Sequence, residues 1–459
     1  MTSSLIRAIS HARNERDRFL AELQDFLEIP SISSDPLCDP DVAMAAAWVA
    51  DRLKTLGATD VLVYKTGKHP IVYGEIKGAS AGGQDKGLPT VLIYGHYDVQ
   101  RPDPLEEWES EPFVPEIRGD ELFARGAVDN KGPIVASIAA VESLIQAGSI
   151  PVNIKFMIEG EEEVGSPSLP GFLAKHETML SSDISLNGDS GMAAVDTPTI
   201  TYALRGSVET KLTIKGPSVD LHSGLFGGMV HNPIHALAEL IAGMHDEQGC
   251  VTLPDFYQDV LAIDDDERAD LAKIPRDEAF SLAITGVPAL WGESAYTPVE
   301  RTGARPTLDI LMIQGGAQKS AIPATAQAII SMRLVPDQSP ERAYEQLRSF
   351  VELNAPKSVT WEMSLFEGSR PSFVDRNTPW IAAMSKALES SWGTRPLYDR
   401  IGGSIPAVSM LRDQLGIDSV LIGVYRPGDN LHAPNEKLHL PTWERTIETI
   451  IRFFNNLEG

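Results

Sequence analysis

Three consecutive glutamates, Glu161–Glu163, follow an apolar segment at residues 154–158 that is rich in β-branched and aromatic side chains. A buried parallel strand that ends in a polar site has this pattern. Successive side chains of an extended segment point to opposite sides, so Glu161 and Glu162 would face different groups. One of them could hold a metal while its neighbour faces a substrate water, although a solvated acidic loop has the same composition.

A second cluster follows the apolar segment 91–94, where His96 and Asp98 are two residues apart. Side chains at this spacing lie on one side of an extended segment. The imidazole could therefore bind a metal while the carboxylate orients it from behind. A simple loop hydrogen bond would give the same spacing.

Asp129 and Asn130 precede a helix that begins near Pro133. Either residue could merely cap this helix. A carboxylate has two oxygens, however, so Asp129 could instead bridge two cations.

Two more candidates follow strands later in the chain: Asp189 comes after the segment 184–186, and His432 comes after the segment 419–424. Alone, the first would be a turn residue and the second an ordinary loop histidine. Together, the clusters occupy the ends of several strands, and ligands of open α/β sheets bind at the carboxyl ends of strands. The sequence therefore predicts one shared site.

The residue types at this site favour metal chemistry. Two histidines and several carboxylates, without a cysteine, form a ligand set that suits zinc, manganese or cobalt. A pair of cations that share Asp129 would polarise a carbonyl and acidify a bridging water. A remaining glutamate would then accept the proton of that water.

The elements that must position these residues alternate between helices and strands over residues 1–205. Helical periodicity predicts helices at 5–28, 41–56, 134–147 and 169–180, and short apolar segments predict strands at 61–64, 71–76, 91–94, 154–158 and 184–186. A glycine-rich loop is expected at 78–87. The alternation predicts an α/β domain with a mostly parallel sheet and helices on both faces.

The pattern changes near Gly206, where alternating strands and two helices predict a compact α+β domain. An acidic, irregular stretch at 250–305 would elaborate this domain. The α/β pattern then resumes and ends in a helix at 441–454. We therefore predict one α/β domain formed by residues 1–205 and 375–459, with an inserted α+β domain at 206–374.

The composition is that of an acidic globular protein. Of 459 residues, 42% are hydrophobic, and 39 basic against 64 acidic side chains give a net charge of −25. Such a surface repels nucleic acid and anionic membranes, and no apolar run reaches the about 18 residues of a membrane span. Two cysteines, Cys38 and Cys250, argue against a disulfide framework, and the amphipathic N-terminus does not resemble a signal peptide. We expect a cytoplasmic protein.

Seven motifs, in this order, resemble those of the M20 metallopeptidase family, most of all its dipeptidase branch that includes the carnosinases. They are HYD at 96–98, VDNKG at 128–132, EGEEEVGS at 159–166, NGDSG at 187–191, DLHSG at 220–224, GGSIP at 402–406 and HAPNE at 432–436. The resemblance implies two divalent metal ions, zinc or manganese with cobalt possible. Their implied ligands are His96, Asp129 and Asp189 for one ion, and Asp129, Glu162 and His432 for the other.

The resemblance also implies roles around the metals. Asp98 would orient His96, and Glu161 would be the general base. The peptide bond between Asp129 and Asn130 is expected to be cis. Many relatives have a second aspartate at the position of Asn130, so this departure leaves the ligand role with Asp129.

Substrate contacts are expected from the inserted domain and from the GGSIP loop. His222 would reach the site of a neighbouring subunit and stabilise the oxyanion, as the resemblance implies. Arg333 is a planar double donor that suits a substrate carboxylate. The backbone around Gly403 and Ser404 could form an anion-binding nest.

The resemblance thus implies a homodimeric, dinuclear metal-dependent dipeptidase that uses Glu161 as its base. Residues 1–205 and 375–459 would form its catalytic domain, and the domain at 206–374 would be its lid and dimerisation domain. An amidohydrolase that acts on N-acyl or ureido amino acids would use the same metal chemistry. A metal-binding protein without catalytic activity is the alternative from another class.

Overall fold

The computed structural model describes residues 3–79 and 87–457, so the loop expected at 78–87 falls largely outside the described residues. The chain forms two compact units: residues 1–202, 374–399 and 406–459 make the first, and residues 203–373 and 400–405 make the second. The sequence analysis assigned the segment 400–405 to the catalytic domain, whereas the structure assigns it to the second unit.

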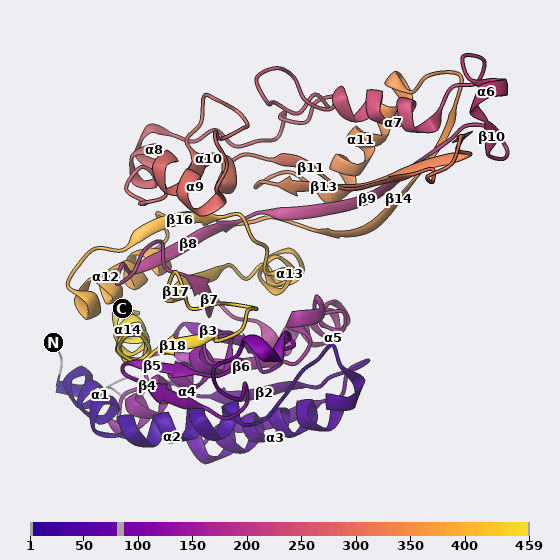
Figure 1. Ribbon diagram of the computed structural model, residues 1–459. Helices are drawn as coiled ribbons and strands as arrows, with labels where there is room; N and C mark the ends of the chain where they lie inside the picture. Colours follow the sequence, from indigo (N-terminus) through magenta and orange to yellow (C-terminus); the bar gives the residue numbers. More distant parts are fainter. Residues whose placement is uncertain (1–2, 80–86, 458–459) are drawn as a thin grey trace. The chain divides into compact units, whose positions relative to one another are not determined.

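The first unit is built on a sheet whose central strands are parallel (Figure 1). The four central strands are, in spatial order, β6 (Asn153–Glu159), β3 (Thr90–His96), β7 (Ile184–Gly191) and β17 (Ser419–Tyr425). Antiparallel strands extend this sheet: β2 (Ile71–Ile76) and β1 (Thr59–Tyr64) on one side, and β8 (Thr199–Leu204) on the other. Two further strands pair with β8, namely β15 (Ser372–Phe373) and β16 (Leu397–Ile401). The predicted α/β class with a mostly parallel sheet is confirmed.

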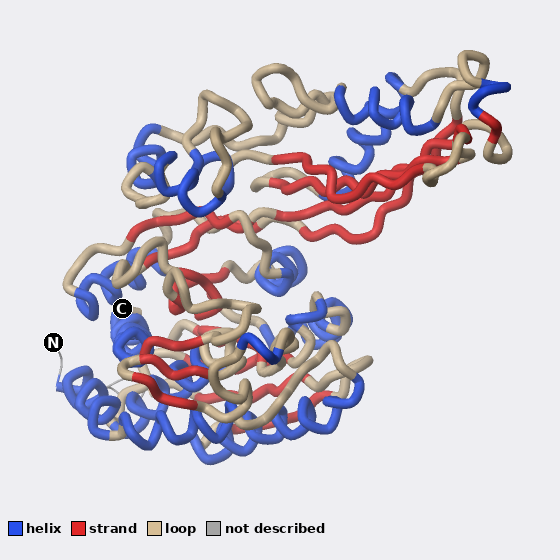
Figure 2. Tube along the Cα trace, viewed as in Figure 1, coloured by secondary structure: helices blue, strands red, loops and turns tan. Residues whose placement is uncertain are grey.

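Helices cover both faces of this sheet (Figure 2). The main core lies under α1 (Ser3–Asn14), α2 (Arg16–Leu27), α3 (Asp39–Leu56), α4 (Lys131–Gln146), α12 (Pro379–Trp392) and α14 (Leu440–Asn456). The opposite face is packed by α5 (Leu169–Leu180) and α13 (Pro406–Leu415). Both cores use alternate residues of one strand, because Ile93 belongs to the first core while Leu92 and Tyr94 belong to the second.

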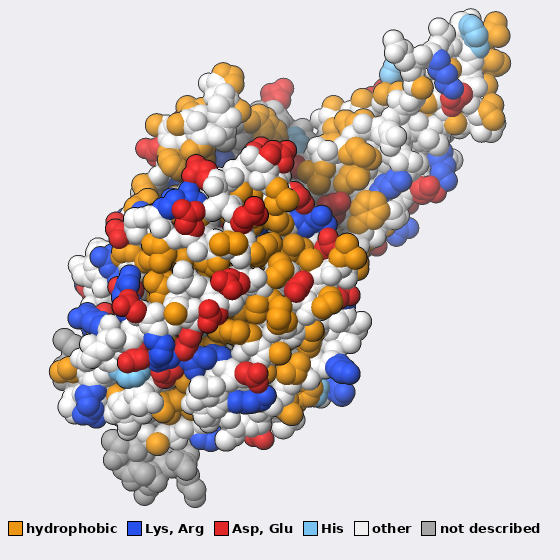
Figure 3. Space-filling model, turned by 60° about the horizontal axis from the view of Figure 1, so that its bottom comes forward, with side chains coloured by type: hydrophobic (Ala, Val, Ile, Leu, Met, Phe, Trp, Pro, Cys, Tyr) orange, Lys and Arg blue, Asp and Glu red, His pale blue; other side chains and the backbone are white. Residues whose placement is uncertain are grey.

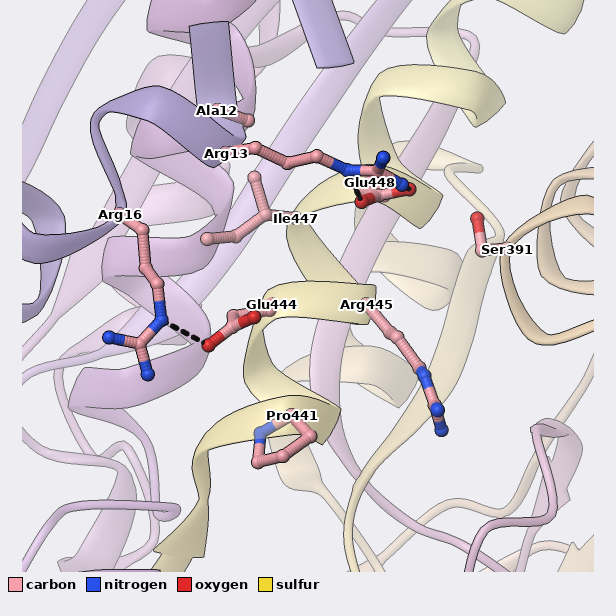
Figure 4. Close-up of a pocket in the computed structure, with 9 residues that line it drawn as sticks. All are labelled: Ala12, Arg13, Arg16, Ser391, Pro441, Glu444, Arg445, Ile447 and Glu448. Carbon is pink, nitrogen blue, oxygen red and sulfur yellow. Dashed lines mark hydrogen bonds and ion pairs between the residues drawn. The ribbon is translucent and has the colours of Figure 1, made fainter. Parts of the chain in front are cut away.

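The two ends of the chain pack against each other within the first unit. Arg13 Nε lies 2.6 Å from Glu448, and Arg16 Nε lies 2.5 Å from Glu444 (Figure 4). Apolar residues of α1 and α14 belong to the same core beneath these ion pairs. The C-terminal segment therefore completes the fold that the N-terminal segment begins.

A small antiparallel sheet joins the segment before Asp129 to the segment after His432. Its strands are β4 (Glu116–Arg118), β5 (Glu121–Phe123) and β18 (Lys437–His439). Lys437 is paired with Phe123, so the loops that carry the two candidate ligands start from neighbouring strands.

The second unit contains a four-stranded antiparallel sheet. Its spatial order is β11 (Thr307–Gly315), β13 (Thr325–Leu334), β9 (Gly206–Lys215) and β14 (Thr360–Ser369). One face is covered by α7 (Pro233–Ala242) and α11 (Pro340–Asn354). The tip carries β10 (Leu221–His222), β12 (Ala321–Ile322) and α6 (Ser223–Phe226), and the stretch 250–305 contains α8 (Asp265–Leu271), α9 (Glu278–Thr285) and α10 (Pro298–Gly303). The predicted α+β class is confirmed.

The surface carries charges of both signs. On the face drawn in Figure 3, acidic side chains are scattered among basic and apolar ones. Within the described ranges, no helix combines the length and the apolar character that crossing a membrane requires.

Candidate metal centre

Parallel strands bring the predicted polar clusters to one edge of the sheet. His96 of β3 is paired with Glu159 of β6, and Tyr94 of β3 is paired with Asn187 of β7. The segments that follow these strands therefore leave the sheet at the same level. This alignment explains how residues far apart in sequence reach one site.

His96, Asp129 and Asp189 form a first group of candidate ligands, whose ligand atoms all lie within 4.8 Å of one another. His96 Nε2 lies 3.1 Å from Asp129 Oδ1 and 3.6 Å from Asp189 Oδ2. This nitrogen is buried and has no hydrogen-bond partner. A buried nitrogen that faces two carboxylate oxygens without a hydrogen bond fits a metal ligand, because buried polar atoms otherwise find partners.

Asp98 lies behind His96. His96 Nδ1 is 3.1 Å from the carbonyl oxygen of Asp98 and 3.5 Å from its Oδ1. These acceptors favour a proton on Nδ1, which leaves Nε2 available to a metal. The Asp98 carboxylate also accepts hydrogen bonds from the backbone N–H groups of Glu162 at 3.3 Å and Glu163 at 3.1 Å. One side chain thus orients the imidazole and the glutamate segment together.

Asp129, Glu163 and His432 form a second group of candidate ligands. His432 Nε2 lies 2.9 Å from Asp129 Oδ2 and 3.3 Å from Glu163 Oε2. Asp129 presents Oδ1 to the first group and Oδ2 to the second, so its carboxylate is common to both. Two adjoining groups with one shared carboxylate have the arrangement of a two-metal site.

The structure differs from the sequence prediction at the three glutamates. Glu163, not Glu162, is grouped with Asp129 and His432. The reason is local, because Glu162–Val164 form a turn of 3-10 helix (η3) and not an extended segment. Successive side chains in such a turn are rotated by about 120° and not by the about 180° of a strand. Two neighbouring glutamates can therefore face the same site.

Glu161, the predicted general base, lies in neither group and is only 2% exposed. Its Oε1 accepts hydrogen bonds from the backbone N–H of His69 at 2.7 Å and from the hydroxyls of Thr66 and Ser168 at 3.1 and 3.0 Å. Its Oε2 accepts one from the backbone N–H of Ser168 at 2.9 Å. These contacts tie the end of β6 to the segment 66–69 and to the residue before α5. The Glu161 carboxylate is thus engaged in structural contacts.

Glu162 is the glutamate of this segment that neither the ligand groups nor a structural contact uses. Burial raises the pKa of Glu162 well above its usual value, and nearby carboxylates add to this effect against the opposing charge of His96. A carboxyl group with a raised pKa beside candidate metal ligands is suited to take up and release a proton.

Negative charge is in excess at this site. Among the described residues, no lysine or arginine forms an ion pair with the carboxylates in question, which are those of Asp129, Glu162, Glu163 and Asp189. Burial raises the pKa of Glu163 to about 7. Burial acts in the same direction on Asp129, but the contacts with His432 and His96 outweigh it and lower the pKa. When all four carboxylates are ionised and both imidazoles are neutral, these groups carry a charge of −4, which two divalent cations would balance.

The backbone around two of the candidate ligands bears on the alternatives that the sequence left open. Asn130 is the N-cap residue of α4, but its side chain makes no capping hydrogen bond, so capping does not account for this segment. The Asp129–Asn130 peptide bond is cis. Asp189 lies within β7, which continues to Gly191, so the segment 187–191 is a strand and not a turn.

His222 and the predicted substrate-binding residues belong to the second unit. His222 lies in β10, is exposed, and its Nδ1 accepts a hydrogen bond from the backbone N–H of Gly224 at 3.0 Å. Arg333 lies near the end of β13, and Gly403 and Ser404 follow β16. None of these residues is in the unit that contains the candidate ligands.

Glu163 is the site residue that the sequence analysis missed. A signal was present, because Gly160 and Gly165 lie on either side of the glutamates. Gly165 adopts a φ of 83°, a conformation that favours glycine. A glycine on each side of a short polar segment indicates a turn and not a continued strand.

The chain is similar to known metallopeptidases over most of its length. The profile of peptidase family M20/M25/M40 matches residues 92–456, which is well over half of the chain. The chain is 30% identical to the Cys-Gly metallodipeptidase DUG1 of Candida albicans, over 95% of this chain and 93% of the relative. It is 28% identical to the human Beta-Ala-His dipeptidase, over 96% and 90%. The solved structure of the M20 family metallo-carboxypeptidase Sso-CP2 from Sulfolobus solfataricus is similar with a TM-score of 0.82, at 28% identity over 96% of this chain and 99% of that one.

Proposed function

The chain belongs to peptidase family M20/M25/M40, and we propose that it is a dinuclear metal-dependent dipeptidase. The observation that carries this proposal is the shared carboxylate of Asp129, which presents one oxygen to His96 and the other to His432. Imidazole and carboxylate ligands suit zinc or manganese, with cobalt also possible. When bound, the two cations would polarise the substrate carbonyl and activate a water for attack.

The proposed ligands follow the two groups in the structure. One ion would be held by His96, Asp129 and Asp189, and the other by Asp129, Glu163 and His432. The buried Nε2 of His96, which lacks a hydrogen-bond partner, supports this assignment. Glu163 takes the place that the sequence analysis gave to Glu162.

Glu162 is proposed as the general base in place of Glu161. Its carboxyl group is buried beside both ligand groups, and its raised pKa suits proton transfer. Glu162 would take the proton of the attacking water and pass it to the leaving amine. The four hydrogen bonds that Glu161 accepts already occupy its two oxygens.

Dipeptides are the proposed substrate class. Two relatives that align over most of their length are named as dipeptidases for Cys-Gly and for β-Ala-His. A dipeptide has a free carboxylate, which the Arg333 guanidinium and the backbone N–H groups around Gly403 and Ser404 are suited to bind. An N-acyl amino acid carries the same carboxylate, so both substrates belong in the assay.

We also propose a cytoplasmic homodimer in which His222 of one copy acts at the site of the other. An exposed histidine in a separate unit, without an acidic partner among the described residues, is suited to such a role. His222→Ala is expected to lower kcat by about 10²- to 10³-fold, the usual cost of losing one oxyanion donor. Metal content measured on the same sample should not change. Normal turnover in this variant would contradict the role of His222.

The test of the proposed function combines metal analysis with a substrate panel. We expect two metal ions per chain after loading with zinc or manganese, and hydrolysis of Cys-Gly and β-Ala-His in preference to N-acetyl amino acids. Chelation should remove the activity. Preference for N-acetyl amino acids would replace the proposal with a deacylase, and absence of stoichiometric metal would reject it.

A carboxypeptidase is a second candidate, because the similar solved structure with a TM-score of 0.82 is that of a metallo-carboxypeptidase. The two activities differ in the length of the substrate. A tripeptide with a blocked N-terminus distinguishes them, since a carboxypeptidase releases its last residue and a strict dipeptidase leaves it intact.

A further inference from the structure

Glu436 is a fully buried carboxylate that lies close to the candidate metal centre without being one of its ligands. It follows His432 by four residues in the loop between β17 and β18. Its side-chain partners all come from the segment 125–129, which ends at the shared residue Asp129.

Both oxygens of Glu436 are saturated by this segment. Oε2 accepts hydrogen bonds from Arg125 Nη1 at 2.6 Å and from the backbone N–H of Gly126 at 2.9 Å. Oε1 accepts them from the backbone N–H groups of Val128 at 3.0 Å and Asp129 at 3.2 Å. The last of these donors belongs to the ligand residue itself, so the carboxylate fixes the backbone from which Asp129 projects.

Arg125 links the same two segments in the reverse sense, because it lies before Asp129 and binds the loop of His432. Its guanidinium is 1% exposed, and Nη2 donates to the carbonyl of Ala433 at 3.3 Å, directly after His432. His432 itself has a φ of 56°, in the left-handed region that residues other than glycine adopt only when their surroundings hold them there. The hydrogen bond to Ala433 therefore fixes the backbone directly after His432, the residue with the unfavourable conformation.

We propose that Arg125 and Glu436 form a positioning pair that sets the spacing between the loops of Asp129 and His432. The two loops meet where His432 Nε2 lies 2.9 Å from Asp129 Oδ2, but neither ligand can set that spacing alone. The pair joins them through buried, charge-assisted hydrogen bonds, which are stronger and more directional than neutral ones. This inference rests on the proposed metal centre, because it assigns the pair to ligand geometry and not to overall stability alone.

Zinc affinity of Glu436→Gln tests the proposal. The amide NH2 group of glutamine would face two N–H donors where the carboxylate now accepts from both, so the segment 125–129 must shift. We expect Zn²⁺ to bind about 10- to 100-fold more weakly at both sites, as is usual when a partner of a metal ligand is lost. The measurement is a titration of the metal-free full chain with Zn²⁺ in the presence of a competing chelator.

Glu142→Gln is the matched control. Glu142 lies in α4 of the same unit and accepts hydrogen bonds from Arg18 and Arg52, but it contacts no candidate ligand. This variant also removes a carboxylate that is paired with arginine. It should lower the melting temperature while Zn²⁺ affinity and the stoichiometry of two ions stay at wild-type values.

Arg125→Lys provides a second variant in case Glu436→Gln does not fold. Lysine keeps the positive charge beside Glu436. It lacks the planar guanidinium, however, so it cannot also donate to the carbonyl of Ala433. Weaker Zn²⁺ binding, chiefly at the site that contains His432, is expected.

The outcomes separate this inference from the proposed function. Wild-type protein that binds two Zn²⁺ ions, together with variants at Glu436 and Arg125 that bind them equally well, would overturn the positioning role alone. Wild-type protein that binds no Zn²⁺ would overturn the metal centre itself. Equal loss of affinity in Glu142→Gln would show a general effect of stability and would also overturn the inference.

Discussion

Two kinds of buried carboxylate lie close together in the first unit, and their surroundings differ. Glu161 and Glu436 each accept four hydrogen bonds from N–H, O–H or guanidinium donors. Asp129, Glu163 and Asp189 instead face imidazoles and one another, without a lysine or arginine partner among the described residues. Glu163 Oε2 accepts one amide hydrogen bond, from Gln100 Nε2 at 2.9 Å. The first kind is satisfied by the protein alone, whereas the second requires cations from solution.

The number of hydrogen-bond donors around a buried carboxylate therefore indicates its role, which the residue type alone does not. A buried carboxylate whose oxygens all accept hydrogen bonds has its polar atoms satisfied by the protein, so its role is structural. Carboxylates that crowd together without donors repel one another and remain ionised only beside a positive charge. The predictions below test whether this criterion assigns the residues correctly.

The largest effect is expected when the shared carboxylate is removed. Asp129→Ala takes one oxygen from each ligand group, so we expect both metal ions to be lost and turnover to fall by about 10³-fold or more, since metal activation is worth several kcal/mol. Metal content by elemental analysis and kcat on a dipeptide are the measurements. Retention of two ions would show that Asp129 is not common to both sites.

Glu162→Gln should give the next largest loss of turnover, and it tests most directly the contrast between Glu161 and Glu162. Loss of the proposed base is expected to lower kcat by about 10²- to 10⁴-fold while both metal ions remain bound. The matched variant is Glu161→Gln, one residue away, for which kcat should stay within a few-fold of wild type. If Glu161→Gln abolished turnover and Glu162→Gln did not, the assignment from the sequence would be restored.

These two glutamates also show how far the sequence could predict the site. His96 ends β3, Asp189 lies near the end of β7, and His432 follows β17. These parallel strands align, so the periodicity that predicts the strands also predicts that the three residues meet. Asp129 instead lies between β5 and α4, outside the parallel sheet. The roles of the glutamates depend instead on whether residues 162–164 form a turn or continue a strand. Tertiary contacts decide this, since Asp98 binds the N–H groups of Glu162 and Glu163 from a distant part of the chain.

The assignment of residues 400–405 to a domain likewise depends on contacts that the sequence does not reveal. The segment 400–405 is too short to carry a periodicity of its own, and its sequence continues the pattern of the α/β domain. In the structure, the Arg205 side chain, from the second unit, donates to the carbonyl of Gly402 at 3.2 Å. Such a long-range contact leaves no trace in local composition.

A smaller effect, on stability and not on turnover, is expected from Glu161→Gln. The amide cannot accept all four hydrogen bonds, because its NH2 group would face an N–H or O–H donor. One unsatisfied buried group costs about 1–3 kcal/mol, so the free energy of unfolding should fall by that amount. Chemical denaturation with and without bound metal measures it. Unchanged stability would mean that these contacts do not make the carboxylate structural.

Glu159 is intermediate between the two kinds of carboxylate. It is fully buried, but among the described residues it accepts only two side-chain hydrogen bonds, from Tyr94 at 2.8 Å and Ser166 at 3.0 Å. Burial raises the pKa of Glu159 to about 7, and the nearby charge of Asp98 acts in the same direction. The folded protein therefore holds this proton to a higher pH than the unfolded chain, whose glutamates titrate near the ordinary value of about 4.3.

The sign of the pH dependence follows from this difference in proton binding. Below pH about 4.3, Glu159 is protonated in both states, and its contribution to stability is fully present. Between pH about 4.3 and about 7 the unfolded chain loses this proton while the folded state keeps it, so stability falls by up to about 4 kcal/mol and levels off once the pH has risen through about 7. Glu159→Gln removes this titration. The difference in unfolding free energy between wild type and variant, measured on metal-free protein at pH 5 and pH 8, should therefore shift in favour of the variant at the higher pH. A pH-independent difference would mean that two hydrogen bonds already satisfy the Glu159 anion. A buried carboxylate would then need fewer than four donors to be satisfied by the protein alone.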